Sequence, residues 1–315
     1  MTTEQIACRI KSVEKLNDQI SAFELQTIDS DFVDIESGAH LDVILGDDLI
    51  RQYSIFRHSA DNKSCHIAVK REDEGRGGSL HMHGLSEGDL LTVSQPRNNF
   101  QLDSDLEHYT LIAGGIGVTP IFSMANTLKL SGKRFDVYYL IQSAQDAAFT
   151  HLFEALDLGD NLHIHVSDES GLTDFPSVFE NLPDQSVIHT CGPESMMQAV
   201  EQAAKAKDID VYLERFSALP IDTDQENENF QVEIRSTGAV YTIEEDASIL
   251  DILLEEGVEV DFGCMEGVCG ACVTDVLDGD IEHRDSILTD KEQAANNTMC
   301  VCVSRALSPR LVLDL

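Results

Sequence analysis

Three cysteines in one short loop constrain this chain more than any other feature of its sequence. Cys264, Cys269 and Cys272 form a C-x4-C-x2-C run, and Cys300 and Cys302 follow after a gap. A plant-type [2Fe–2S] cluster takes four thiolates from this spacing and one distant cysteine, so the run predicts such a cluster. In an extended segment Cys300 and Cys302 would point to the same face, so strand alternation leaves both open as the fourth ligand.

The glycines between these cysteines support the prediction. Gly263, Gly267 and Gly270 would let the loop fold closely around inorganic sulfide, because glycine accepts positive φ and leaves room for backbone N–H groups. Zinc also takes four cysteines, but it favours two C-x2-C pairs, and here only Cys269 and Cys272 form one. Zinc binding and disulfide bonding are the alternatives.

Length and composition indicate a large protein without a membrane anchor. A chain of 315 residues with 42% hydrophobic content can form two or three domains with hydrophobic cores. The first residues, MTTEQIACRIKSVEKL, lack the apolar core of a signal peptide, so we expect a cytoplasmic protein with reduced cysteines. The longest weakly polar run, Leu111–Met124, is too short to span a bilayer.

The charge balance excludes some classes of partner. The chain has 21 Lys and Arg against 57 Asp and Glu, a formal net charge of −36. Nucleic acids and anionic membranes are recognised by clustered cations, so neither is expected as a partner. The acidic residues form either a solvated, salt-adapted surface or a docking face for a basic protein.

The N-terminal residues are predicted to form an antiparallel β-barrel, because Ile6–Val13, Ile20–Thr27 and His40–Leu45 alternate between apolar and polar side chains. Two motifs in this region suit a flavin that carries a phosphate. Arg51, Tyr53 and Ser54 offer a charge, an aromatic ring and a hydroxyl on one strand. The glycine turn GRGGS, residues 75–79, opens a helix whose free N–H groups suit a dianion. Each motif alone is also compatible with an ordinary strand or turn.

An apolar strand, a glycine-rich turn and an amphipathic helix follow in YTLIAGGIGVTPIFSMANTLKL. This order is typical of a nucleotide site, although the spacing differs from the dinucleotide fingerprint. Gly114, Gly115 and Gly117 would let a pyrophosphate approach the backbone. Thr119 would donate a hydrogen bond, and Pro120 suits the first helical turn. Further strands predict an α/β domain with a mainly parallel sheet: Asp136–Ile141, Leu162–Val166 and Ser186–Thr190.

Two features bear on the nucleotide itself. A short turn joins a strand to the helix ESMMQAVEQAAKA and consists of Cys191, Gly192 and Pro193. Taken alone, this tripeptide is compatible with an ordinary strand-to-helix turn. No Lys or Arg occurs between Arg134 and Lys205, although this interval includes the loop where a 2′-phosphate would be recognised. The sequence therefore predicts NADH as the electron donor in preference to NADPH.

The residues around the cysteine loop predict a further domain. FQVEIRS and VYTI form a hairpin, and a helix follows that Asp246 or Ser248 caps and Gly257 ends. The predicted buried stripe of this helix is Ile249, Leu250, Leu253 and Leu254. Two strands, a helix, a cluster loop and further strands are the β-grasp order of plant-type ferredoxins.

Several motifs occur in one order along the chain: RQYS, HIAVKRE, GRGGS, VSQPRNNF, GGIGVTP, CGP, ERF and MCVCVSRALSPRLVLDL. In this order the chain resembles the phthalate dioxygenase reductase family over essentially its full length. The resemblance implies the monomeric reductase component of a two-component Rieske-type oxygenase system. Electrons would pass from NADH through FMN to the [2Fe–2S] cluster and on to the oxygenase. FMN is implied because this branch lacks the adenine-binding element of its FAD relatives.

The motifs and the resemblance together assign site residues. The flavin residues are Arg51, Tyr53, Ser54, Ala68, Val69, Lys70, Gly77, Gly78 and Ser79. The nucleotide residues are Gly114, Gly115, Gly117, Thr119, Pro120, Gly192 and Pro193. By resemblance, Cys191 would lie beside the nicotinamide, Phe216 near the flavin ring, and Cys302 would join Cys264, Cys269 and Cys272 as the fourth cluster ligand. His283–Asp285 would have a structural role.

We therefore expect a multidomain fold with four segments. They are an FMN-binding β-barrel (1–105), an NAD-binding α/β domain (106–220), a polar acidic linker (221–229) and a plant-type [2Fe–2S] ferredoxin domain (230–315). Met265, Glu266 and Val268 would form the exposed rim where electrons leave the cluster. The alternative functions are a standalone NADH diaphorase and a carrier, redox sensor or zinc-bound interaction protein without catalysis.

Overall fold

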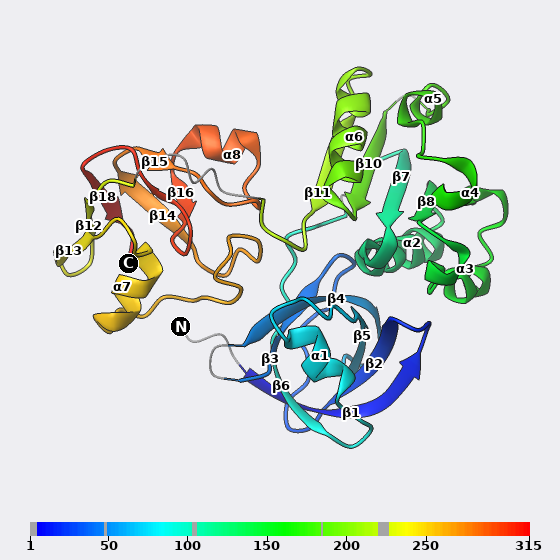
Figure 1. Ribbon diagram of the computed structural model, residues 1–315, viewed down its shortest axis with the longest axis horizontal. Helices are drawn as coiled ribbons and strands as arrows, with labels where there is room; N and C mark the ends of the chain where they lie inside the picture. The colour runs from blue at the N-terminus through cyan, green and yellow to red at the C-terminus, as the bar shows by residue number, and fades with distance from the viewer. Residues whose placement is uncertain (1–4, 47–48, 103–105, 184, 220–226) are drawn as a thin grey trace. The chain divides into compact units, whose positions relative to one another are not determined.

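The computed structural model describes residues 5–46, 49–102, 106–183, 185–219 and 227–315 (Figure 1). They fall into two compact units, Gln5–Glu214 and Arg215–Leu315. Most of the predicted linker, residues 221–226, lies outside the described residues, so the predicted boundary at residue 220 stays a proposal. In the described part of the chain, no helix is long and apolar enough to cross a membrane.

A closed antiparallel barrel forms the first part of the N-terminal unit. Its strands are β1 (Gln5–Lys15), β2 (Ile20–Thr27), β3 (His40–Ile44), β4 (Ile50–His58), β5 (Ser64–Lys70) and β6 (Leu90–Ser94). They pair in the order β1-β2-β5-β4-β3-β6 and confirm the predicted barrel. Ile6, Cys8 and Ile10 alternate along β1 and are fully buried. Helix α1 (Gly78–His83) adds Met82 to this core.

A five-stranded parallel sheet forms the second part of the same unit. Its strands are β7 (His108–Gly114), β8 (Arg134–Ile141), β9 (Leu162–Val166), β10 (Ser186–Cys191) and β11 (Asp210–Glu214), in the order β11-β10-β7-β8-β9. The α-helices are α2 (Val118–Ser131), α3 (Thr150–Leu156), α4 (Ser167–Ser170), α5 (Phe175–Phe179) and α6 (Glu194–Lys205). Three short 3-10 helices are η1 (Gly115–Gly117), η2 (Ala144–Asp146) and η3 (Gly159–Asn161).

Helices cover both faces of this sheet, because successive side chains of each strand point to opposite faces. Leu111 of β7 packs in one buried cluster with residues of α2 and α3, whereas the next residue, Ile112, packs with residues of α5 and α6. Burial on both faces explains why every residue of β7 is buried, instead of alternate ones.

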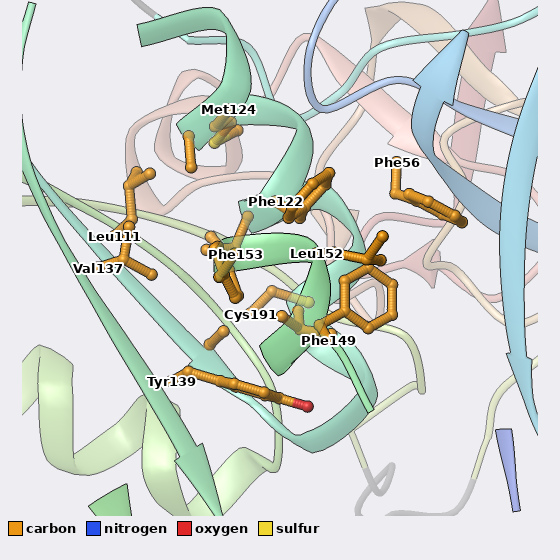
Figure 2. Packing of buried hydrophobic residues seen from close by; sticks show 14 of the residues in the cluster. Phe56, Leu111, Phe122, Met124, Val137, Tyr139, Phe149, Leu152, Phe153 and Cys191 are labelled. Atoms are coloured by element: carbon orange, nitrogen blue, oxygen red, sulfur yellow. The ribbon is translucent and has the colours of Figure 1, made fainter. Parts of the chain in front are cut away.

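An aromatic cluster joins the barrel to the parallel sheet within the N-terminal unit. Phe56 of β4, Phe122 of α2 and Phe149, which precedes α3, meet edge to face in Figure 2. Their ring centroids lie 6.1 Å (Phe56–Phe122), 5.2 Å (Phe56–Phe149) and 5.7 Å (Phe122–Phe149) apart. Edge-to-face pairs add to the free energy gained by burying the rings. This cluster therefore fixes the barrel against α2.

The C-terminal unit has the predicted β-grasp arrangement. Its elements are β12 (Phe230–Ile234), β13 (Val240–Ile243), α7 (Ile249–Glu255), β14 (Val273–Asp278), β15 (Ile281–Glu282), α8 (Asp290–Ala295), β16 (Thr298–Cys300), β17 (Arg305–Ala306) and β18 (Arg310–Leu313). A mixed sheet has the order β13-β12-β18-β14-β16, and β15 pairs with β17. The cysteine-containing loop lies between α7 and β14.

Helix α7 follows its prediction except at one residue. Ser248 is the N-cap and forms a capping box with Asp251. Ile249, Leu250 and Leu253 are fully buried, but Leu254 is 37% exposed, so its assignment to the buried stripe was wrong. Leu254 lies in the last turn of the helix, which ends at Glu255.

We expect Phe122→Ala to destabilise the N-terminal unit by about 3–5 kcal/mol, because it removes a buried ring with three edge-to-face neighbours. The transition is followed in urea by tyrosine near-UV circular dichroism, since most tyrosines lie in this unit. Leu172→Ala, at a side chain that is 91% exposed, is the control and should change the free energy of unfolding by less than about 0.5 kcal/mol. Equal effects of the two variants would contradict the assignment.

Candidate functional site

The two predicted flavin motifs meet in the structure. A Cβ atom on Gly78 would lie 2.5 Å from Arg51 Cγ and 3.0 Å from its Nε, so a larger residue here would force the Arg51 side chain to move. Arg51 Nη2 also donates to the Arg76 carbonyl at 3.2 Å. Gly77 has φ 86, in the left-handed region that favours glycine, and α1 starts directly after it. A guanidinium at the start of a helix suits a phosphate group.

The remaining predicted flavin residues line the same part of the barrel. Ala68 and Val69 are buried on β5, and Lys70 forms an ion pair with Glu72 at 2.9 Å. Ser79 Oγ accepts from the Glu72 N–H at 3.0 Å, so this hydroxyl ties the glycine turn to the end of β5. Burial raises the pKa of Tyr53 to about 12, which keeps its phenol protonated and able to donate.

A buried polar network lies on the neighbouring strands, and sequence analysis missed it. Asp42 Oδ1 accepts from Gln52 Nε2 at 2.7 Å and from Arg97 Nη2 at 2.8 Å. His40 stands opposite Ser54 in the β3–β4 register. Burial, helped by Arg97, lowers the pKa of His40 to about 4, so this imidazole is neutral at pH 7. Its ring nitrogens have no hydrogen-bond partner among the described residues.

Glu214 connects this network to the parallel sheet. Ser54 Oγ donates to Glu214 Oε2 at 3.5 Å, and His40 Nδ1 lies 3.9 Å from Glu214 Oε1. Burial raises the pKa of Glu214 to about 8, so its carboxyl is mostly protonated at neutral pH. Glu214 pairs with Cys191 across β11 and β10. The structure thus brings Ser54 of the flavin motif together with Cys191 of the nucleotide motif.

Two glycine-containing turns pack backbone against backbone at the carboxyl edge of the parallel sheet. A Cβ on Gly114 would lie 2.5 Å from Pro193 Cδ, and one on Gly192 would lie 2.8 Å from Gly114 Cα. A Cβ on Gly117 would overlap the Cys191 carbonyl and lie 2.8 Å from Gly192 N. These glycines are therefore required for the contact between the two turns, which is a different reason from the predicted approach of a pyrophosphate.

Other residues of the first turn have different surroundings. Gly115 has φ 53 and no atom within 4 Å of an added Cβ, so this residue faces open space. Thr119 Oγ1 donates to the Ile116 carbonyl at 3.1 Å, inside the turn, and Pro120 is buried in the first turn of α2. The chain runs from β7 to β8 on one side and returns to β10 on the other. Ligands of parallel sheets bind at this kind of switch point.

The loop after β8 carries a carboxylate where a 2′-phosphate would need a cation. Ser143 N and Oγ both donate to Asp146 Oδ2, at 2.9 and 2.8 Å. This capping box orders the loop and holds its negative charge in place.

The four predicted cluster cysteines are buried and form two pairs. The Cys264 N–H donates to Cys269 Sγ at 3.4 Å, and the Cys272 and Cys302 Sγ atoms lie 3.1 Å apart. Hydrogen bonding from Cys269 lowers the pKa of Cys264, and hydrogen bonding from Cys300 and Cys302 lowers that of Cys272. A two-iron cluster takes two thiolates on each iron, so paired cysteines fit it.

Backbone geometry around the cysteines also fits a cluster. Glu266 N donates to Cys264 Sγ at 3.3 Å, and backbone N–H groups that face sulfur stabilise the thiolate form. Gly267 and Gly270 have φ 70 and 71, as predicted, whereas the third residue in the left-handed region is Met265, not Gly263. Across the described ranges, no three His, Cys, Asp or Glu side chains converge on one metal-ion position.

Cys300 and Cys302 are both close to Cys272, but their surroundings differ. Cys300 ends β16 and Val301 to Val303 form a turn, so the two cysteines do not share an extended strand. The Gly267 N–H hydrogen-bonds the Cys302 sulfur, which also interacts electrostatically with Cys264 of the other pair. Cys302 therefore contacts Cys272 and also interacts with Cys264 of the other pair, and it remains the proposed fourth ligand.

The last two predicted elements lie in the C-terminal unit. Phe216 is 47% exposed there. The Asp285 side chain is fully buried and accepts from Leu288 N at 2.8 Å, which fits the structural role expected of His283–Asp285. Met265 is 45% exposed between the ligands, whereas Glu266 and Val268 are half-buried.

Comparison with known proteins bears on the class of this chain. Residues 7–102 match the family model of the oxidoreductase FAD-binding domain, and residues 232–307 match that of the 2Fe-2S iron-sulfur cluster binding domain. The barrel, the parallel sheet and the cysteine loop therefore define a flavin iron–sulfur oxidoreductase.

Relatives with this architecture cover the whole chain. Phthalate dioxygenase reductase from Burkholderia cepacia is 36% identical in an alignment 325 residues long that covers 100% of each chain. A solved structure of phthalate dioxygenase reductase has a TM-score of 0.71 and covers 99% of this chain and 98% of its own. Vanillate O-demethylase oxidoreductase from Pseudomonas putida is 36% identical over 94% of this chain and 95% of its own. Tetrachlorobenzoquinone reductase from Sphingobium chlorophenolicum is 32% identical over 97% of each. The chain belongs to the phthalate dioxygenase reductase family, which confirms the resemblance.

We expect Cys302→Ala to abolish the visible absorption of the [2Fe–2S] cluster, because it removes a thiolate that one iron needs. Cys300→Ala is the matched control, since Cys300 lies only two residues before Cys302 and is also buried. It should keep the absorption and iron content of the unmodified protein. Loss of the cluster in Cys300→Ala with retention in Cys302→Ala would assign the fourth ligand to Cys300.

Glu214 should make the N-terminal unit less stable as pH rises. The folded carboxyl keeps its proton up to a pKa of about 8, whereas the unfolded one loses it near the ordinary value of 4.5. Its contribution is therefore complete below about pH 4.5 and is lost as pH rises to about 8. Glu214→Gln imitates the protonated acid, so its free energy of unfolding should lack this decline. Urea titrations at about pH 5 and pH 8 measure it, and parallel declines would refute the assignment.

Proposed function

We propose that this protein is the reductase component of a two-component Rieske-type oxygenase system, which takes electrons from NADH and passes them to the oxygenase. One observation carries the proposal. Ser54 of the flavin motif, Glu214 and Cys191 of the nucleotide motif are in contact within one compact unit. A hydride donor and a flavin must meet face to face, and these contacts support that meeting point.

The chain's own residues account for several parts of this function. When bound, the flavin accepts hydride and the cluster carries single electrons, and the protein supplies binding, orientation and electrostatics. Arg51 and the start of α1 would hold the flavin phosphate. Tyr53 and Ser54 would contact its ring. The protonated Glu214 would hold a proton next to the Ser54 hydroxyl, which would lie between this carboxyl and the flavin. Cys264, Cys269, Cys272 and Cys302 would ligate the irons.

Two choices of cofactor are part of the proposal. NADH is favoured because the loop after β8 presents Asp146, which would repel a 2′-phosphate. FMN is favoured, although the matching family model is described as FAD-binding, because the barrel motifs resemble the FMN branch. Flavin released by heat and separated by chromatography identifies the cofactor, and FAD would overturn that part.

The oxygenase partner is supported by the relatives, two of which are named for a dioxygenase and a demethylase. The formal charge of −36 suits docking to a basic face on that partner. A second candidate is a standalone NADH-dependent reductase of small acceptors. It is favoured by a relative that is named tetrachlorobenzoquinone reductase. A standalone reductase would transfer electrons to quinone or cytochrome c at a rate that no Rieske-type protein accelerates.

The test uses purified full-length protein with flavin and iron restored. We expect NADH, and not NADPH, to bleach the flavin, then the cluster, and to support cytochrome c reduction. An added Rieske-type oxygenase should then be reduced in the same solution. Absence of any NADH-driven reduction would refute the proposed function, and reduction of quinone alone would favour the second candidate.

Gly117→Ala should impair the use of NADH without harming the flavin. Its Cβ would force the Cys191–Pro193 turn to move, and a displacement of about 1 Å at a reacting centre costs on the order of 100-fold in rate. Flavin reduction by NADH is measured by stopped flow, with photoreduction of the flavin as the internal reference. The control, Gly46→Ala, adds a Cβ with no atom nearer than 3.9 Å and should not change the rate. Unaltered reduction in Gly117→Ala would contradict the assigned contact.

A further inference from the structure

Cys300 is a buried cysteine of the C-terminal unit that lies outside the proposed ligand set. Its side chain is 0% exposed, and its thiol is free. It ends β16, where it stands opposite Val273 in the β14–β16 register, one residue after the proposed ligand Cys272. The Val301 N–H also donates to the Cys272 carbonyl at 3.3 Å. The backbone pairing therefore holds the Cys300 thiol close to a proposed ligand of one iron.

The side chains of these two cysteines are hydrogen-bonded to each other, Cys300 to the sulfur of Cys272. In the protein with its cluster, Cys300 must be the donor, because an iron ligand is a thiolate and has no proton to give. A thiol buried among apolar side chains keeps its proton, and Cys300 packs in one core cluster with Met299 and Val301. The contact is therefore an S–H···S hydrogen bond from a cysteine that binds no iron to one that does.

The other three proposed ligand sulfurs receive hydrogen bonds from the backbone of the cluster loop. The bonds run from Glu266 N to Cys264 at 3.3 Å, from Cys264 N to Cys269 at 3.4 Å, and from Gly267 N to Cys302. A substitution leaves a backbone N–H in place, so the effect of these donors is difficult to measure separately. At Cys272 a donor belongs to a side chain, and one substitution can remove it.

Hydrogen bonds to the ligand sulfurs are one of the features that set the reduction potential of an iron–sulfur cluster. An added electron makes the ligand sulfurs more negative, and a donor binds a more negative acceptor more strongly. The donor therefore stabilises the reduced cluster more than the oxidised one. Its presence raises the reduction potential, and its removal should lower it.

We propose that Cys300 raises the reduction potential of the [2Fe–2S] cluster by donating a hydrogen bond to the sulfur of Cys272. A higher potential increases the driving force for electron transfer from the flavin to the cluster. The inference rests on the electron path proposed above and on Cys302 as the fourth ligand. It goes beyond them by assigning a role in that path to a cysteine that binds no iron.

The experiment is a potentiometric titration of the full-length protein with flavin and cluster bound. Dithionite is the reductant, so the result does not depend on NADH, and the EPR signal of the reduced cluster is the readout. In Cys300→Ala, the loss of one hydrogen bond of ordinary strength should decrease the ratio of reduced to oxidised cluster about fivefold at a fixed potential. For one electron this is a shift of about 40 mV to lower potential. Cys300→Ser keeps a donor and should restore most of the potential.

Infrared spectroscopy tests the hydrogen bond itself. Once four cysteines bind iron, S–H stretching bands can come only from the other four, which are Cys8, Cys65, Cys191 and Cys300. The band that disappears in Cys300→Ala belongs to Cys300. Reduction of the cluster should move this band to lower frequency, because a more negative acceptor weakens the S–H bond of its donor.

Val301→Ala is the matched control. Val301 follows Cys300 and is also 0% exposed, but its side chain has no donor. Its truncation should leave the potential unchanged, although it also leaves a cavity in the same core cluster.

Four results would overturn the inference. They are an unchanged or higher potential in Cys300→Ala, an equal decrease in Val301→Ala, equal potentials in Cys300→Ala and Cys300→Ser, and a Cys300 band that does not move on reduction. Loss of the cluster in Cys300→Ala would also overturn it, because Cys300 would then be a ligand. Failure of NADH to reduce the flavin would count against the proposed function alone.

Discussion

The contact between two glycine-containing turns is the constraint on which the rest of the N-terminal unit depends. Gly114 ends β7 and Gly117 follows it, while Cys191 ends β10 and Gly192 follows it. A side chain on any of the three glycines would push the turns apart. Since β7 and β10 are parallel neighbours, their carboxyl ends must lie at one edge of the sheet. Close packing there sets the position of Cys191, and the β10–β11 register then sets that of Glu214. The buried Glu214 carboxyl therefore reaches Ser54 because the turn contact positions Cys191 and the strand register positions Glu214 beside it.

Local patterns in the sequence were sufficient to predict the elements and most candidate residues. The period-2 alternation of β1, the apolar run of β7 and the cysteine spacing each reflect interactions within one segment. Even the error at Leu254 is of this kind. Its spacing fits the buried stripe, but the helix ends one residue later, where burial no longer depends on helical periodicity. Patterns of this type therefore predict an element better than they predict its last turn.

The buried polar network could not be predicted in the same way. His40, Asp42 and Glu214 look like ordinary surface residues in the sequence, and only the β3–β4 register and the order of the parallel sheet bring them to Ser54 and Arg97. A partial signal was present. His40 and Asp42 alternate along β3 with the apolar residues Leu41 and Val43, so the two polar side chains point to the same face. Recognising that this face is buried requires the closed barrel.

The distribution of cations explains how so acidic a chain can keep a stable interior. Only 21 Lys and Arg oppose 57 Asp and Glu, and two of the arginines, the half-buried Arg97 and the buried Arg305, bind groups in the interior. Arg97 binds Asp42, and Arg305 stacks on Phe230 and donates to the Ala247, Glu228 and Glu244 carbonyls. A buried guanidinium satisfies several acceptors at once because its five N–H groups are fixed in one plane. The excess of acidic residues gives a formal net charge of −36, which repels anions and would attract a basic partner over a distance of about one Debye length.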